Sequence, residues 1–331
     1  MRRLTVLLVS LFLIFSVASV FAGGQKEQPT EQMKAAQPGG GYTYYVVTHG
    51  GPGDPWWGGV FNNGIEAAQD YYANTEIQWL GPAKYDVQKQ VDMLNTAISA
   101  DPDGIVITIP NARAMEEPIR RIHEKGIPLI TVNVTDERFD YLCYVGQKEY
   151  DAGYGCGEQA LKMMGDDLES AVVLIHEVGH AGLEARAEGF ADATADAGVS
   201  VEKLAGKPNQ AENYQALEAY LTKNPDTDLV FTLGPLGAHP TLSLFEDKGW
   251  NDRYSLCSVD TSERMMNAIK DGHMLFASGQ EPWLQAFLPI GFLNLYNMYG
   301  FAPQGDGRTG PSIITQDNGD LMMEMVQKGI R

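Results

Sequence analysis

The sequence contains few cysteines and few basic residues. It has three cysteines in 331 residues, so at most one disulfide can form and a disulfide-rich scaffold is excluded. Lysine and arginine number 24 against 43 aspartates and glutamates, a formal net charge of −19. Nucleic acids and anionic lipids repel such a chain, so neither is an expected partner. The 44% of hydrophobic residues is typical of a globular protein.

The odd number of cysteines leaves at least one thiol unpaired. Cys143 and Cys257 lie in apolar, strand-like runs, YLCYV and YSLCSV. No pair has the CxxC spacing typical of a metal site. We therefore favour buried free thiols for Cys143, Cys156 and Cys257, and we expect neither a metal nor another cofactor.

Residues 1–22 have the pattern of a secretory signal peptide more than that of a membrane span. Two arginines precede an apolar run over residues 4–20, and Ala22 ends a small-residue cleavage site, with Ala18 as an alternative. The first cysteine is Cys143, so no cysteine follows the run to carry a lipid anchor. We predict export to the periplasm or another extracytoplasmic space.

The polar residues 23–41 read as a flexible linker, and the globular part begins near Tyr42. From there, short apolar β-branched runs alternate with amphipathic stretches, which predicts parallel sheets covered by helices on both faces. Strands are expected over 42–48, 76–81, 105–109, 127–133, 171–175, 199–205, 228–234, 255–260, 273–279 and 313–315. Helices are expected over 60–72, 87–100, 114–125, 151–164, 183–197, 212–223, 241–248, 262–271, 285–298 and 317–328.

The pattern restarts near residue 151, so the fold class is α/β with two Rossmann-like, doubly wound lobes. The elements after Gly279 suggest that the chain crosses between the lobes more than once. In such folds, ligands bind just outside the carboxyl ends of the strands.

The segment 176–180, HEVGH, matches the zinc-protease motif HExxH. That motif needs both histidines on one face of a helix. Here the strand-like AVVLI precedes it, and Gly179 and Gly182 disfavour a helix. We interpret HEVGH as a polar loop at a strand end and keep a zinc hydrolase as an alternative.

The run HGGPGDPWW (49–57) follows the first strand but lacks the spacing of a phosphate loop. Two indoles and a carboxylate suit a sugar, because indole faces pack on C–H groups and Asp54 can accept from hydroxyls. Alternatively, Asp54 caps the helix and one tryptophan belongs to the core. We expect Trp56 and Trp57 to divide these two roles.

Polar residues at strand ends are candidate ligand contacts. Asn133 ends one strand and Asp260 another, although Asp260 could instead cap the following helix. Arg186 can form a forked hydrogen bond to ligand hydroxyls. Alternatively, it forms a surface ion pair with Glu184 or Glu188.

In order and spacing, several motifs resemble the periplasmic sugar-binding proteins of ABC transporters, the ribose/xylose/galactose-type group of type I periplasmic binding proteins. The resemblance covers nearly all of residues 42–330. The motifs are DPWW (54–57), GP followed by DVQKQ (81–90), PDGI (102–105), GIPLI (126–130), RAEGF (186–190), NPD (224–226), VD (259–260) and GQ (279–280).

The resemblance implies two lobes joined by a three-segment hinge that closes on the ligand. It places the N-terminal lobe at 42–145 plus 281–312 and the C-terminal lobe at 146–280 plus 313–331. It implies no catalytic residue. The implied ligand contacts are Asp54, Trp56, Trp57, Asn133, Arg186, Asn209, Asp260 and Gln280, with Gln210 as an alternative to Asn209.

Two positions depart from the ribose-binding pattern. Val134 stands where ribose binders have an arginine, and Gly234 where they usually have a polar residue. We therefore expect His49, Glu177 or His180 to supply missing contacts.

The resemblance implies a solute-binding protein, not an enzyme, that delivers a small sugar or polyol to an ABC permease. A chemoreceptor is a further candidate partner, and a monomer is expected. A non-sugar ligand on the same fold, such as a quorum signal or a nucleoside, remains an alternative.

Overall fold

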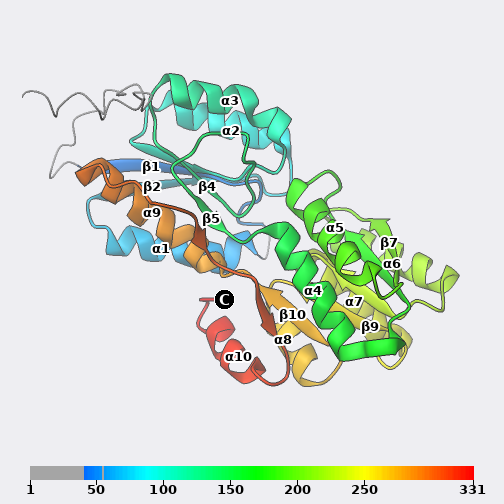
Figure 1. Ribbon diagram of the computed structural model, residues 1–331. Helices are drawn as coiled ribbons and strands as arrows, with labels where there is room; N and C mark the ends of the chain where they lie inside the picture. The colour runs from blue at the N-terminus through cyan, green and yellow to red at the C-terminus, as the bar shows by residue number, and fades with distance from the viewer. Residues whose placement is uncertain (1–40, 54–55) are drawn as a thin grey trace, which may run out of the picture. The chain divides into compact units, whose positions relative to one another are not determined.

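The structure is a computed structural model that describes residues 41–53 and 56–331. The predicted signal peptide (1–22) lies outside the described residues, as do Asp54 and all but the last residue of the predicted linker (23–41). In the part of the chain that is described, ten α-helices surround two six-stranded sheets (Figure 1). None of these helices is both long and apolar enough to cross a membrane.

The first sheet has the order β11-β5-β4-β3-β1-β2, and its strands are all parallel. Its central strands are buried along their whole length, which explains why they read as continuous apolar runs. The strands are β1 (Tyr42–Val47), β2 (Thr75–Leu80), β3 (Gly104–Ile107), β4 (Leu129–Val132), β5 (Tyr144–Gly146) and β11 (Gly307–Arg308).

Helices cover both faces of this sheet and complete what we call the first lobe. The π-helical turn η1 (Trp57–Phe61), α1 (Asn62–Tyr71) and α9 (Pro282–Tyr299) pack on one face. On the other face lie α2 (Val87–Ser99) and α3 (Ala112–Glu124) (Figure 1). Both of these begin at short polar residues whose side chains accept a backbone N–H, Asp86 for α2 and Asn111 for α3.

The second sheet has the order β12-β10-β9-β8-β6-β7, in which only the pairing of β12 with β10 is antiparallel. Strands occur in the same sequence order as in the first sheet, so β1 corresponds to β6, β3 to β8 and β4 to β9. The strands are β6 (Ser170–Ile175), β7 (Ser200–Ala205), β8 (Leu229–Thr232), β9 (Ser255–Val259), β10 (Phe276–Gly279) and β12 (Ser312–Ile314).

Helices also cover both faces of the second sheet and complete the second lobe. The helices α4 (Glu149–Met164) and α5 (Ala181–Ala195) pack on one face, and the short turn η2 (Gly165–Asp167) follows α4. On the other face lie α6 (Gln210–Lys223), α7 (Pro235–Lys248), α8 (Glu263–Lys270) and α10 (Gly319–Gln327).

The predicted fold class is confirmed: two parallel-sheet α/β lobes. The chain passes between the sheets after β5, after β10 and after β11, which makes three crossings. The exact residues at which the lobes divide stay a prediction.

Sequence patterns missed two short strands and misplaced one helix start. Strands β5 and β11 have three and two residues, too few to show a period. Helix α7 begins at Pro235, six positions before the expected residue 241, because proline fits the first turn of a helix.

The three cysteines are buried free thiols. Cys143 lies in the core of the first lobe. Cys156 and Cys257 lie in one core cluster of the second lobe.

Candidate functional site

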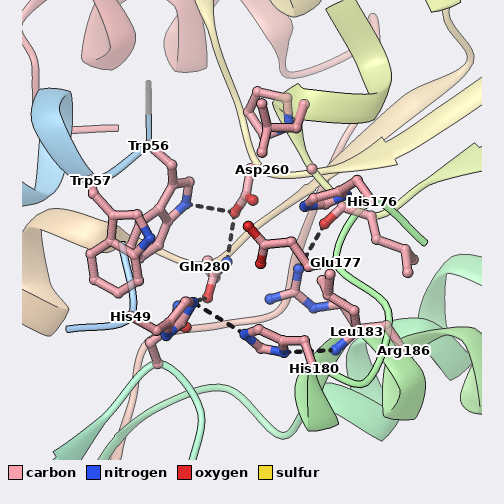
Figure 2. Close-up of a pocket in the computed structure, with 15 residues that line it drawn as sticks. His49, Trp56, Trp57, His176, Glu177, His180, Leu183, Arg186, Asp260 and Gln280 are labelled. Atoms are coloured by element: carbon pink, nitrogen blue, oxygen red, sulfur yellow. Dashed lines mark hydrogen bonds between the residues drawn. The ribbon is translucent and has the colours of Figure 1, made fainter. Parts of the chain in front are cut away.

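A pocket lies at the carboxyl ends of the strands, between residues of the two sheets (Figure 2). Six of the eight predicted contacts line it: Trp56, Trp57, Asn133, Arg186, Asp260 and Gln280. His49, Glu177 and His180, which were expected to supply missing contacts, line it as well.

Asp260 joins the two lobes through its carboxylate. It directly follows β9 and is 6% exposed. Its Oδ1 accepts hydrogen bonds from Trp56 Nε1 at 2.9 Å and from Gln280 Nε2 at 2.6 Å (Figure 2). Burial raises the pKa of Asp260, and the Arg186 guanidinium and these two donors oppose that rise. The alternative that Asp260 caps α8 is wrong, because Ser262 is the capping residue.

Asn133 holds the corresponding place in the first lobe, directly after β4. Its Nδ2 donates to Gln280 Oε1 at 3.2 Å and to Gln285 Oε1 at 3.3 Å. Both Asn133 and Asp260 have positive φ angles, 63° and 68°. Asparagine and aspartate tolerate this conformation better than most residues, which accounts for short polar residues at these two turns.

An aromatic wall comes from the first lobe. Trp57 is 5% exposed and packs edge-on against Phe61 and Trp56, with ring centroids 4.9 and 4.4 Å away. Gly50 allows this placement, because a Cβ there would lie 2.2 Å from the Trp57 ring. Trp57 thus belongs to the core and to the pocket lining, while Trp56 is only partly buried and reaches Asp260.

Arg186 is buried, and its ion-pair partner is neither of the expected glutamates. It pairs with Glu149: Nε donates to Oε2, and Nη2 donates to Oε1 at 3.0 Å. A third bond runs from Nη1 to the Leu233 carbonyl at 2.9 Å. The alternative of a surface pair with Glu184 or Glu188 is wrong, since helix residues two apart do not face each other.

The Glu149–Arg186 pair is almost fully buried: the exposed fraction is 9% for Glu149 and 4% for Arg186. Burial raises the pKa of the Glu149 carboxyl, and the guanidinium opposes this by favouring the ionised form. Burial alone would lower the pKa of Arg186, but the Glu149 charge outweighs it and raises that pKa. The positive charge is therefore balanced before any ligand arrives.

A hydrogen-bond relay of two histidines crosses the cleft (Figure 2). His180 caps α5, since its Nδ1 accepts from the backbone N–H of Gly182 at 3.1 Å. The remaining proton of neutral His180 is therefore on Nε2, which lies 3.1 Å from His49 Nε2. His49 Nδ1 in turn lies 2.9 Å from Thr108 Oγ1. Burial lowers the pKa of His49 to about 3 and that of His180 well below its usual value, so both rings are neutral.

The HEVGH segment lies in the loop between β6 and α5, and its last residue, His180, caps α5. It does not present two histidines on one helical face. Ligand atoms of His49, Glu177 and His180 do lie within 4.8 Å of one another. However, a cation at His180 Nε2 needs the lone pair there, and the cap on Nδ1 assigns that atom a proton. The geometry favours the relay over a metal site.

Strand-end position would also have identified His176, which directly follows β6 and lines the pocket. It is 7% exposed, and its Nδ1 has no hydrogen-bond partner among the described residues. Burial lowers its pKa to about 3. A buried, unsatisfied nitrogen in a pocket indicates a place for a ligand group. Glu149 gave no comparable signal, because its partner is 37 positions away.

Asn209 and Gln210 do not line this pocket. Asn209 caps α6, where its side chain accepts the N–H of Glu212 at 3.1 Å, and Gln210 is the first residue of that helix. Asp54 lies outside the described residues.

The chain matches the model of a known protein family. Residues 44–296 match the model of the periplasmic binding protein domain family. The chain belongs to that family. This periplasmic binding protein has two parallel-sheet α/β lobes and a pocket lined by residues of both.

Similar proteins of this family bind sugars. The xylose/arabinose-binding protein XylF of Sulfolobus acidocaldarius is 23% identical over 79% of this chain and 70% of that protein. A periplasmic sugar-binding protein of Legionella pneumophila has 28% identity and a TM-score of 0.76, over 81% of this chain and 99% of the other. A carbohydrate transporter protein of Acidothermus cellulolyticus, solved with myo-inositol, has 25% identity and a TM-score of 0.80, over 88% and 100%.

Proposed function

We propose that this periplasmic binding protein captures a small sugar or polyol between its lobes and delivers it to an ABC-type permease. The observation that carries the proposal is the pairing of two walls. Trp56 and Trp57 offer indole surface from the first lobe, and Asp260 offers a carboxylate from the second. A sugar can pack its C–H faces on the indoles and donate hydrogen bonds from its hydroxyls to the carboxylate.

The side-chain chemistry suits a ligand with many hydroxyls. Asp260 is an acceptor, Gln280 and Asn133 offer both donors and acceptors, and His176 Nδ1 has no partner among the described residues. A buried hydroxyl without a partner costs free energy, so this set selects ligands whose hydroxyls match it. The sugar and inositol ligands of similar proteins support the same class.

Capture requires the lobes to separate and close. The Trp56–Asp260 bond and the His49–His180 contact both connect side chains of different lobes. A ligand that contacts both walls stabilises closure, and the three chain crossings act as the hinge. We propose that the permease recognises the closed form, that the protein performs no reaction, and that residues 1–22 direct its export.

Thermal melting of the purified protein tests the proposal. The ligands are L-arabinose, D-xylose, D-glucose, D-galactose, myo-inositol and adenosine, with Zn²⁺ and a chelator as further conditions. Ligand at 100 times its Kd stabilises by about 2.7 kcal/mol, a shift of several degrees. We expect a sugar or the polyol to raise the Tm and the metal conditions to leave it unchanged.

Two results would redirect the assignment. A shift with adenosine alone would favour a nucleoside ligand on the same fold. A decrease with the chelator and no shift with any solute would favour a metal site at His49, Glu177 and His180.

A further inference from the structure

Three charged side chains line the pocket in the described part of the chain. Among the described lining residues, Glu177, Arg186 and Asp260 carry charge. The three lining histidines are neutral, because burial lowers the pKa of His49 and His176 to about 3 and that of His180 well below its usual value. The described part of the lining therefore presents one guanidinium and two carboxylates.

The charge of the Arg186 guanidinium is already neutralised by Glu149. Glu149 engages Arg186 with both carboxylate oxygens, and Gln147 Nε2 donates to Glu149 Oε2 at 3.0 Å, which fixes the carboxylate in place. Glu149 does not itself line the pocket. An anionic ligand would thus meet a balanced Arg186 and the negative charges of Asp260 and Glu177, whose carboxylate points into the pocket (Figure 2).

Given the proposed function, we propose that the cleft accepts neutral and amino sugars and rejects anionic ones, and that Glu149 sets this selection by neutralising Arg186. An unpaired arginine in a buried pocket binds a carboxylate through two parallel hydrogen bonds. Glu149 occupies that binding mode internally, so a uronate or sugar phosphate meets no unpaired cation among the described lining residues to offset its desolvation. Like charges at Asp260 and Glu177 add a repulsive component to the selectivity.

The experiment compares matched sugars that differ in charge. Calorimetry measures the Kd of D-glucose and D-galactose, of D-glucuronate and D-galacturonate, and of D-glucosamine and D-galactosamine. We expect each uronate to bind the unmodified protein at least about 100-fold more weakly than its neutral counterpart, which corresponds to about 2.7 kcal/mol. The amino sugars should bind within about tenfold of the neutral ones.

Three variants assign the selection to residues. Glu149→Gln should improve the uronate-to-neutral affinity ratio at least about tenfold, and Glu149→Asp, which keeps the charge, should restore the original ratio. A purely structural role for Glu149 would lower all affinities together and leave the ratio unchanged. Glu177→Gln, at a less buried position, should also improve the ratio, and it tests the charge argument if Glu149→Gln does not fold.

The matched control is Glu184→Gln on the same helix as Arg186. Glu184 is about two-fifths exposed, pairs with Lys203 and does not line the pocket, so the ratio should not change. Uronate binding within threefold of the neutral sugar, or unchanged ratios in both Glu149→Gln and Glu177→Gln, would overturn the charge selection while sugar binding stands. If no sugar of any charge binds, the proposed function itself fails.

Discussion

The two lobes place different chemistry on the same backbone positions. His49 lies two residues after the end of β1, and Glu177 lies two residues after the end of the corresponding β6. Asn133 directly follows β4, as Asp260 directly follows β9, and both adopt positive φ angles. At each position the first lobe carries a neutral group and the second an acidic one.

The division extends to the rest of the pocket. Both tryptophans come from the first lobe, whereas Arg186 and its partner Glu149 come from helices of the second. The first lobe therefore supplies the indole surface, and the second supplies the charged side chains of the described lining. Because the indoles and the charged groups lie on different lobes, we expect tight binding only when the two walls meet.

The largest expected effect concerns the buried Glu149–Arg186 ion pair of the second lobe. Arg186→Met leaves the Glu149 carboxylate buried without its cation, which typically costs about 3–5 kcal/mol. Urea denaturation should show this loss in the free energy of unfolding. The double variant with Glu149→Leu should recover most of it, because apolar replacement of a buried pair is often neutral.

Arg120→Met is the matched control for this loss. Arg120 pairs with Glu117 on the surface of α3 with 55% of its side chain exposed, so its removal should leave the free energy of unfolding nearly unchanged. Equal losses at the two arginines would refute the claim that the second lobe depends on a buried pair.

The next effect concerns the ligand itself. Asp260→Asn replaces a charged acceptor that joins the lobes, and hydrogen bonds to charged groups contribute about 1.5–3 kcal/mol. Affinity for the best sugar should fall about 10- to 150-fold by calorimetry. Asp271→Asn, on the exposed end of α8, is the control and should not change it. If the affinity of Asp260→Asn stays within threefold of the original, Asp260 is not a ligand contact.

A smaller effect is the pH dependence of the histidine relay. The pKa of folded His180 lies well below its usual value, which is about 6.5 in an unfolded chain. Between these values the unfolded chain binds more protons, so this contribution to stability is complete above pH of about 6.5 and decreases as the pH falls. Glu149 and Asp260, whose pKa values are raised, have the opposite sign, and their contribution decreases as the pH rises.

His180→Asn isolates the histidine term, because asparagine preserves the helix cap and does not titrate. Melting from pH 7 to pH 5 should show a shallower acid loss, by at most about 1.4 kcal/mol per pH unit. The contributions of Glu149 and Asp260 are present in both proteins and therefore cancel in this comparison. If His180→Asn leaves the slope unchanged, His180 does not titrate on unfolding.

The smallest effect distinguishes a cap from a ligand contact. Asn209→Ala removes the N-cap of α6 and should cost about 1 kcal/mol of stability. Ligand affinity should not change. Asn209→Ser should retain most of the stability, since serine also caps helices. A loss of affinity without a loss of stability would instead support the contact predicted from the sequence resemblance.

Much of the fold and part of the site follow from local sequence patterns. The long strands and helices have clear periods, and the rule that ligands bind at strand ends identified Asn133 and Asp260. The same rule applies to His176, which directly follows β6, although the HEVGH motif that begins there is typical of a zinc site. Strands β5 and β11 are too short to show a period.

The partner of Arg186 shows where local reasoning fails. Nearby glutamates on the same helix looked suitable, but they point elsewhere, and Glu149 reaches Arg186 from the neighbouring helix α4. Such a pair depends on how two helices pack on a sheet, and one sequence carries no direct signal for it. The balance of charge in the cleft could therefore be derived only from the structure.

The buried cysteines make the protein convenient to label. Burial raises the pKa of Cys143 and Cys156 to about 12 and that of Cys257 well above its usual value, so none of them forms the reactive thiolate near neutral pH. A cysteine introduced on an exposed surface would then react selectively with a maleimide dye. Two such dyes, one on each lobe, would report the opening and closing of the cleft by energy transfer in a protein that keeps its native thiols.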